Sequence, residues 1–165
     1  MKNYKHIFQL CLLCWYSIMF SQINVKNIEI VRDAYGVPHI FGKTDAETAY
    51  GLAWAHSEDD FKTIQLAYMA GNGLLSKHKG IKAAPIDFLS QVIESQKTSD
   101  SLYHTLHSDF RKVLEGYTEG INRYAKLHPK EILEKDLFPI TPQKIGAYTF
   151  FQLLFQIKLM TLWLP

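Results

Sequence analysis

Cysteine is almost absent from this sequence of 165 residues. The two cysteines, Cys11 and Cys14, both lie inside an apolar run near the N-terminus. Their C-x-x-C spacing is used by redox and metal sites, but an apolar segment that is removed on export is the simpler interpretation. The chain after residue 22 then contains no cysteine, which excludes a disulfide framework.

An excess of charge of one sign is also missing. The chain has 18 Lys and Arg against 16 Asp and Glu, and two of the lysines, Lys2 and Lys5, precede the apolar run. The remainder has a net charge near zero and no long basic run, so nucleic-acid binding has no electrostatic support. We therefore expect no nucleic-acid partner and, once the N-terminal segment is removed, no membrane partner.

Several common catalytic motifs are absent. The sequence has no nucleophile elbow, no Gly-rich phosphate loop and no zinc protease helix. Gly71 and Gly73 alone indicate only a turn. Apolar residues make up 47% and aromatic residues 13% of the chain, which is enough to build the core of one modest domain.

The first 22 residues have the pattern of a signal peptide. Lys2 and Lys5 form a basic start, residues 7–20 are apolar, and polar residues follow Ser21 and Gln22. A single membrane anchor is the alternative, although the run is short for a membrane span. We expect a signal peptide over residues 1–22, a domain over 23–165, and a periplasmic or secreted protein.

Local patterns predict a hairpin followed by helices. Residues 25–32 alternate as a strand does, residues 33–36 suit a turn, and residues 37–41 form an edge strand that contains Pro38. Thr44 and Glu47 form a capping box. The helix that follows carries small residues on its buried stripe, which would allow a close neighbour, and residues 71–73 end it.

Helical spacing then continues for most of the chain. Apolar residues predict one helix from Leu102 to Tyr124, whereas residues 77–82 have the composition of a solvated loop. Pro129 starts a short helix, and Thr141 with Pro142 starts a strongly apolar last helix. That helix needs partners to cover it, so we expect further chain downstream. The predicted fold class is α+β and predominantly helical.

Histidine and carboxylate residues form three candidate groups. His104 and His107 have a spacing that could start a metal site on a helix, or simply lie on a solvated face. His56, Glu58, Asp59 and Asp60 could form a metal or acid–base site, or a polar patch of paired and solvated charges. His39 could fix the hairpin turn, and Arg32 and Asp33 are expected to pair locally or to anchor the hairpin.

Two phrases near the start resemble a known family. RDAYGVPHIF (residues 32–41) and YGLAWAHSEDDF (residues 50–61) are similar to the opening of the penicillin acylase family of N-terminal-nucleophile amide hydrolases, which includes acyl-homoserine lactone acylases. Further phrases continue the resemblance in the same order, over residues 114–124, 128–129 and 137–142. One departure is Asp60, where many members carry arginine.

The resemblance implies an incomplete piece of the αββα N-terminal-nucleophile fold, the α-chain portion of a self-cleaving precursor. The partner is then a β chain of the same precursor, whose N-terminal serine forms an acyl-enzyme and which holds the oxyanion hole. The substrate is a small N-acyl amide, a penicillin-type side chain or an acyl-homoserine lactone. No organic cofactor is implied. A structural calcium is expected in the complete protein, with no ligand assignable here.

For the last helix, the resemblance implies a wall of the acyl-side pocket formed by residues 142–159. Leu153, Gln156 and Ile157 would face substrate; ordinary packing is the alternative. We place no catalytic residue in this chain. Two hypotheses follow: the α-chain part of an exported amide hydrolase, or a non-catalytic product, either an inactive remnant or a binding module.

Overall fold

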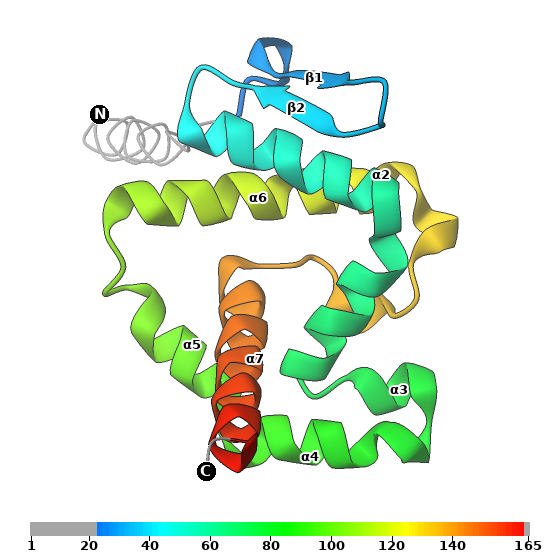
Figure 1. The fold of residues 1–165 in the computed structure, drawn as a ribbon, viewed down its shortest axis with the longest axis vertical. Coiled ribbons are helices and arrows are strands. Elements are labelled where there is room, and N and C mark those ends of the chain that lie inside the picture. The colour runs from blue at the N-terminus through cyan, green and yellow to red at the C-terminus, as the bar shows by residue number, and fades with distance from the viewer. Residues whose placement is uncertain (1–22, 164–165) are drawn as a thin grey trace, which may run out of the picture.

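The computed structural model describes residues 23–163 and is built mainly of helices, with one small antiparallel sheet (Figure 1). This confirms the predominantly helical α+β fold. In chain order the elements are η1 (Val25–Asn27), β1 (Glu29–Arg32), β2 (Pro38–Phe41), α2 (Asp45–Gly71), α3 (Leu75–Lys79), η2 (Ile81–Ala83), α4 (Ala84–Val92), α5 (Ser95–Tyr103), α6 (Ser108–Leu127), η3 (Pro129–Glu131), η4 (Lys135–Leu137) and α7 (Pro142–Trp163).

The expected hairpin is confirmed. β1 and β2 pair with Ile30 opposite Ile40, and the Asp33 carboxylate accepts the backbone N–H groups of Tyr35 and Val37 at 2.8 and 3.0 Å. These bonds hold the pKa of Asp33 below its ordinary value. The expected strand starts later than its pattern suggested, because residues 25–27 form a 3-10 turn.

Helix α2 begins as the sequence predicts and then bends. The Thr44 and Glu47 side chains form the full capping box. At Asp60 the backbone leaves helical geometry (φ −158°, ψ 70°), and the Asp60 carboxylate caps the second half by accepting the N–H of Thr63 at 3.0 Å. The bend lets the first half of α2 pack on α6 while the second half packs near α7 (Figure 1).

Close backbone contact joins α2 to α6, as the small residues of α2 predicted. A Cβ atom added to Gly116 would lie 2.2 Å from the backbone oxygen of Ala46, and one added to Gly120 would lie 2.5 Å from that of Tyr50. These glycines are four residues apart and therefore share one face of α6. The buried side chains of Ala53, Ile121 and Tyr124 extend this contact into the core.

One helix from Leu102 to Tyr124 is a wrong prediction. α5 ends at Tyr103 and α6 starts at Ser108, so His104 and His107 lie at the break and not on one helical face. The break has a packing reason, because α5 contacts α7 whereas α6 contacts α2. No straight helix could follow both partners.

The solvated loop expected near residues 77–82 is also wrong. Residues 75–79 form helix α3, and residues 81–83 form the 3-10 turn η2. The buried carboxylate of Asp87 in α4 accepts the N–H groups of Leu75 and Ser76, both at 2.8 Å, and so caps α3 from outside it. A cap supplied from a later helix is invisible to local composition.

The segment between α6 and α7 is held by side chains of the helices. The Asn122 amide donates to the carbonyl of Ile140 at 2.7 Å and accepts its N–H at 2.8 Å. The Lys144 ammonium group donates to the carbonyls of Leu137 and Pro139 at 2.6 and 3.1 Å. Buried Gln65 donates to the carbonyl of Glu131 and accepts the N–H of Leu133. These bonds fix where α7 starts.

Helix α7 then runs past the end of α2. A Cβ atom added to Gly71 would lie 2.2 Å from the Cα atom of Tyr148, so the two backbones touch. Ala147 and Phe151 are buried, whereas Leu153, Leu154 and Phe155 are exposed. Among the described residues, no helix has the length and hydropathy that crossing a membrane requires.

Replacing Gly116 with alanine should lower the free energy of unfolding. The new methyl group would overlap the Ala46 carbonyl, and overpacking of this kind costs about 1–3 kcal/mol, more than the roughly 1 kcal/mol that alanine contributes as a helix former. Chemical denaturation followed by circular dichroism measures this change. Lys126→Ala, at an exposed position of α6, is the control. Equal stability of Gly116→Ala and the parent would contradict close packing.

Replacing Asn122 with alanine should destabilise the connection to α7. The change leaves the N–H and the carbonyl of Ile140 without partners, and Ile140 is only 2% exposed. Two unsatisfied buried groups cost about 2–4 kcal/mol together. Asn122→Asp keeps an acceptor for the N–H and should fall between parent and alanine variant in the same denaturation experiment. The expectation fails if both variants match the parent.

Candidate functional site

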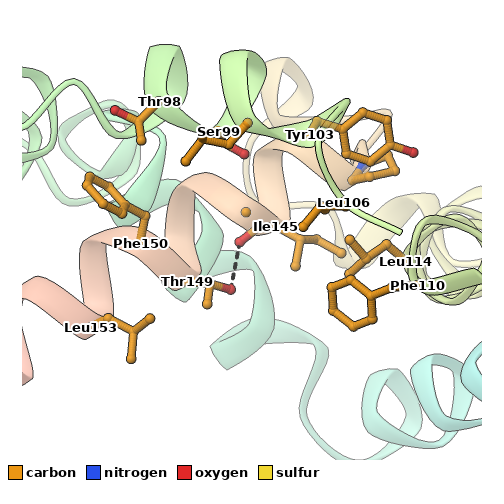
Figure 2. Close-up of a pocket in the computed structure, with 13 residues that line it drawn as sticks. Thr98, Ser99, Tyr103, Leu106, Phe110, Leu114, Ile145, Thr149, Phe150 and Leu153 are labelled. Atoms are coloured by element: carbon orange, nitrogen blue, oxygen red, sulfur yellow. Dashed lines mark hydrogen bonds between the residues drawn. The ribbon is translucent and has the colours of Figure 1, made fainter. Parts of the chain in front are cut away.

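An apolar cavity of about 380 Å³ lies between α5 and α7, beside the start of α6 (Figure 2). Its wall is made almost entirely of carbon. The lining residues are Thr98, Ser99, Leu102 and Tyr103 from α5, Leu106 from the break, Phe110 and Leu114 from α6, and Pro142, Ile145, Gly146, Thr149, Phe150 and Leu153 from α7. A cavity of this kind suits an apolar group of a ligand or of another chain.

A close helix contact sets one side of the cavity. The Ser99 hydroxyl donates to the carbonyl of Gln143 at 2.8 Å, and a Cβ atom added to Gly146 would lie 2.2 Å from the Ser99 oxygen. The hydroxyl of Thr149 donates to the carbonyl of Ile145 at 3.0 Å (Figure 2). Both hydroxyl groups are therefore already bonded, and what they add to the wall is mainly apolar.

Tyr103 brings the main polar group of the wall. Its hydroxyl donates to the carboxylate of Glu115 at 2.8 Å. Burial, together with this bond to a negatively charged partner, raises the pKa of Tyr103 to about 12. The phenol therefore stays protonated at neutral pH and links the end of α5 to α6.

The cavity is open on one side. Leu102, Phe110 and Leu153 line it and are each 52% exposed. Along α7 the exposed apolar surface continues through Leu154 and Phe155. The described residues therefore form one wall of an apolar site and leave the facing side uncovered.

The structure separates the three residues that were predicted to face substrate. Leu153 lines the cavity, whereas Gln156 and Ile157 are exposed and lie outside its wall. A contact of these three residues with substrate remains a prediction. The helical spacing of Leu102, Leu106, Phe110 and Leu114 predicts the buried stripe of one helix. The structure instead places all four in the wall of the cavity.

His56, Glu58, Asp59 and Asp60 form a polar patch whose side chains are bonded within the chain. The three carboxylate residues also line a second cavity, of about 360 Å³. Arg32 pairs with Asp59 at 2.7 Å and with Glu58 at 3.4 Å, so it anchors the hairpin to α2. The bond to Asp59, with the one to Glu58, raises the pKa of Arg32. His56 lies 3.0 Å from the Tyr117 hydroxyl in α6. Each polar group of the cluster thus has a structural partner.

The described part of the chain offers no metal centre. Within residues 23–163 no group of three or more His, Cys, Asp or Glu side chains could hold a metal ion. His39 lies 3.4 Å from the Asp33 carboxylate and supports the hairpin turn, as was expected. No residue described here is therefore assigned to the calcium ion expected in the complete protein.

Comparison with known proteins gives the family. The family model described as penicillin amidase matches residues 27–164, which is most of the chain. The fold also resembles a solved chain of a thermostable penicillin G acylase from Alcaligenes faecalis, with a TM-score of 0.62 and 21% identity, covering 73% of this chain and 69% of that one. The chain belongs to the penicillin amidase family.

Curated relatives whose sequences are similar to this chain are much longer than it. An acyl-homoserine lactone acylase of Pseudomonas fluorescens is 26% identical over 99 residues, which cover 60% of this chain and 12% of the relative. Penicillin G acylase of Escherichia coli is 23% identical over 141 residues, covering 79% and 16%. The chain therefore spans less than a fifth of the length of either relative.

The pKa of Tyr103 is open to a direct test. Glu115→Gln removes the negative charge beside the phenol, so the pKa of Tyr103 should fall from about 12 while burial keeps it above the ordinary value of about 10. Titration of tyrosinate absorbance, with the curve of Tyr103→Phe subtracted, isolates this group. An unchanged pKa in Glu115→Gln would contradict the role given to Glu115.

The same shift makes stability depend on pH. Because the folded-state pKa of Tyr103 is raised, its contribution is complete below the unfolded value of about 10 and is lost as the pH rises through about 12. The difference in unfolding free energy between the parent and Tyr103→Phe should therefore shrink across this range. A difference that does not change with pH would argue against the shift.

Proposed function

We propose that this chain is the N-terminal, α-chain part of an exported amide hydrolase that cleaves N-acyl amides. The observation that carries the proposal is the match of the penicillin amidase family model to residues 27–164. The relatives are named as penicillin acylases and acyl-homoserine lactone acylases, and these two names define the substrate classes that we propose.

A second chain is part of the proposal. One relative, from a Pseudomonas species, is named as a penicillin acylase proenzyme. The solved Alcaligenes chain is covered to 69% by the present chain, whereas the curated relatives are covered to 12–16%. A chain about as short as this one therefore occurs as a separate piece of a penicillin acylase, which supports a β chain as the partner.

Division of labour between the two chains follows from the residues. The described helices supply an apolar wall, in which the hydroxyl groups of Ser99, Tyr103 and Thr149 each donate to a partner within the chain. We assign the serine nucleophile, the amine that activates it and the oxyanion hole to the β chain. The α-chain part would hold the acyl group by burying its apolar surface, which contributes about 0.8 kcal/mol per methylene group.

Leu153 is the residue of α7 that this role concerns most directly. It lies on the cavity wall, half-exposed toward the open side. Gln156 and Ile157 lie farther along α7, outside the wall. We propose that they contact substrate or the β chain only in the assembled enzyme, where the open side is covered.

The proposal predicts that the purified 165-residue chain alone hydrolyses no amide. The assay measures release of the amine from an acyl-homoserine lactone and from a nitrophenyl amide. Co-expression with a β-rich polypeptide that begins with serine, encoded beyond codon 165, should restore turnover. Hydrolysis by the chain alone would overturn the proposal, and the absence of any such coding sequence would favour an inactive remnant.

In the restored enzyme, Leu153→Trp should fill the cavity and discriminate by acyl length. We expect kcat/KM to fall at least tenfold more for a long acyl chain than for a short one, which corresponds to about 1.4 kcal/mol. Ile157→Trp is the matched change outside the wall and should discriminate less. Equal effects of the two variants would contradict the proposal that the acyl group binds in this cavity.

A further inference from the structure

Helix α4 has its polar and apolar faces inverted. Asp87 and Ser90 face the interior and are only 7% and 3% exposed, whereas Phe88 and Val92 are 71% and 59% exposed. A helix that serves only as a cover for a core shows the opposite arrangement. The outward face of α4 therefore needs an explanation other than folding.

The inward polar residues have complete structural roles. Asp87 accepts two backbone N–H groups of α3, from Leu75 and Ser76, and the Ser90 hydroxyl donates to the carbonyl of Asp87 at 3.1 Å. The two bonds of Asp87 attach α4 to α3 through its polar side, and the bond of Ser90 lies within α4. The apolar side is consequently left free for a partner.

The outward apolar residues form a continuous stripe. Pro85, Phe88, Leu89 and Val92 follow the i, i+3, i+4, i+7 spacing of one helix face, and all four are exposed. Ile81, in the turn before α4, is 85% exposed. We call these five residues the α4 stripe.

Basic residues lie beside the α4 stripe. Lys79 and Lys82 flank Ile81 in sequence, are exposed, and make no salt bridge within residues 23–163. Lys77 in α3 pairs with Asp136, and Asp87, the acidic residue of α4, is buried beneath the helix. Solvent therefore meets apolar side chains bordered by the two lysines. The exposed carboxylate that follows α4, Glu94, is paired with Lys97 at 2.9 Å.

We propose that the α4 stripe and its lysines form a docking site for the surface of an anionic phospholipid bilayer. Amphipathic helices with lysine beside aromatic and aliphatic residues lie in the membrane interface in this way. A protein partner is the less suitable occupant, because lysine is depleted in protein interfaces. α3 and α4 also lie at the end of the molecule opposite the hairpin, so α4 can meet a flat surface (Figure 1).

Such docking lies on the membrane and does not cross it. α4 has nine residues, far fewer than the about 20 that a membrane span requires. The near-zero net charge that argued against a membrane partner averages over the whole chain, whereas the folded structure concentrates lysines beside one apolar stripe. The proposal does not depend on the amide hydrolase activity.

The test is hydrogen–deuterium exchange of the full chain with vesicles, read locally by mass spectrometry. Vesicles containing phosphatidylglycerol should slow exchange in residues 81–92, and vesicles of phosphatidylcholine alone should not. A local readout is required because the apolar residues 7–20 could bind vesicles themselves. High salt should weaken the protection, since the attraction is partly electrostatic.

Matched variants sharpen the test. Phe88→Ser should abolish protection, whereas Phe41→Ser, a similarly exposed phenylalanine on the hairpin at the other end, should not. Lys79→Gln with Lys82→Gln should weaken binding about fivefold per lysine, and Lys126→Gln with Lys130→Gln should leave it unchanged. Circular dichroism checks that each variant is folded.

Three outcomes would overturn the proposal. Protection confined to residues 1–22 would place vesicle binding elsewhere. Equal protection by neutral vesicles would remove the role of the lysines. Protection of residues 81–92 that appears only when a co-expressed protein chain is present would make the α4 stripe a protein interface.

Discussion

The packing of the helices depends on the backbone contact between α2 and α6 at Gly116 and Gly120. The backbones of the two helices touch at Gly116 with Ala46 and at Gly120 with Tyr50, so no side chain separates them at these points and the backbones themselves set their relative position. The hairpin is built on the same helix, because a Cβ atom at Gly51 would lie 2.6 Å from Ile40. The hairpin and α6 are thus both positioned by α2.

The positions of α5 and α7 are determined by the bend in α2 and by the break between α5 and α6. Because α2 turns at Asp60, its second half meets α7 at Gly71 and Tyr148. Because α5 and α6 separate, α5 can pack on α7 while α6 remains on α2. The apolar cavity lies between the α5–α7 pair and the start of α6, so residues of all three helices form its wall.

The sequence predicts what is encoded locally. The capping box at Thr44, the turn at Asp33 and the start of α7 at Pro142 each depend on neighbouring residues, and the structure confirms them. The break after Tyr103 and the external cap of α3 depend on distant partners, so a periodic pattern cannot reveal them. For the site, the sequence predicts the apolar character of α7. It does not predict the wall that α5 contributes, because the apolar spacing indicates one continuous helix over α5 and α6.

The segment between α6 and α7 is specified mainly from outside itself. Asn122, Gln65 and Lys144 hold it through its backbone carbonyl and N–H groups, which every residue except proline offers in full. Its exposed side chains are therefore free to change over evolution without moving α7, provided that these three anchors persist. A search for related chains should accordingly find its exposed positions more variable than the three anchors that surround them.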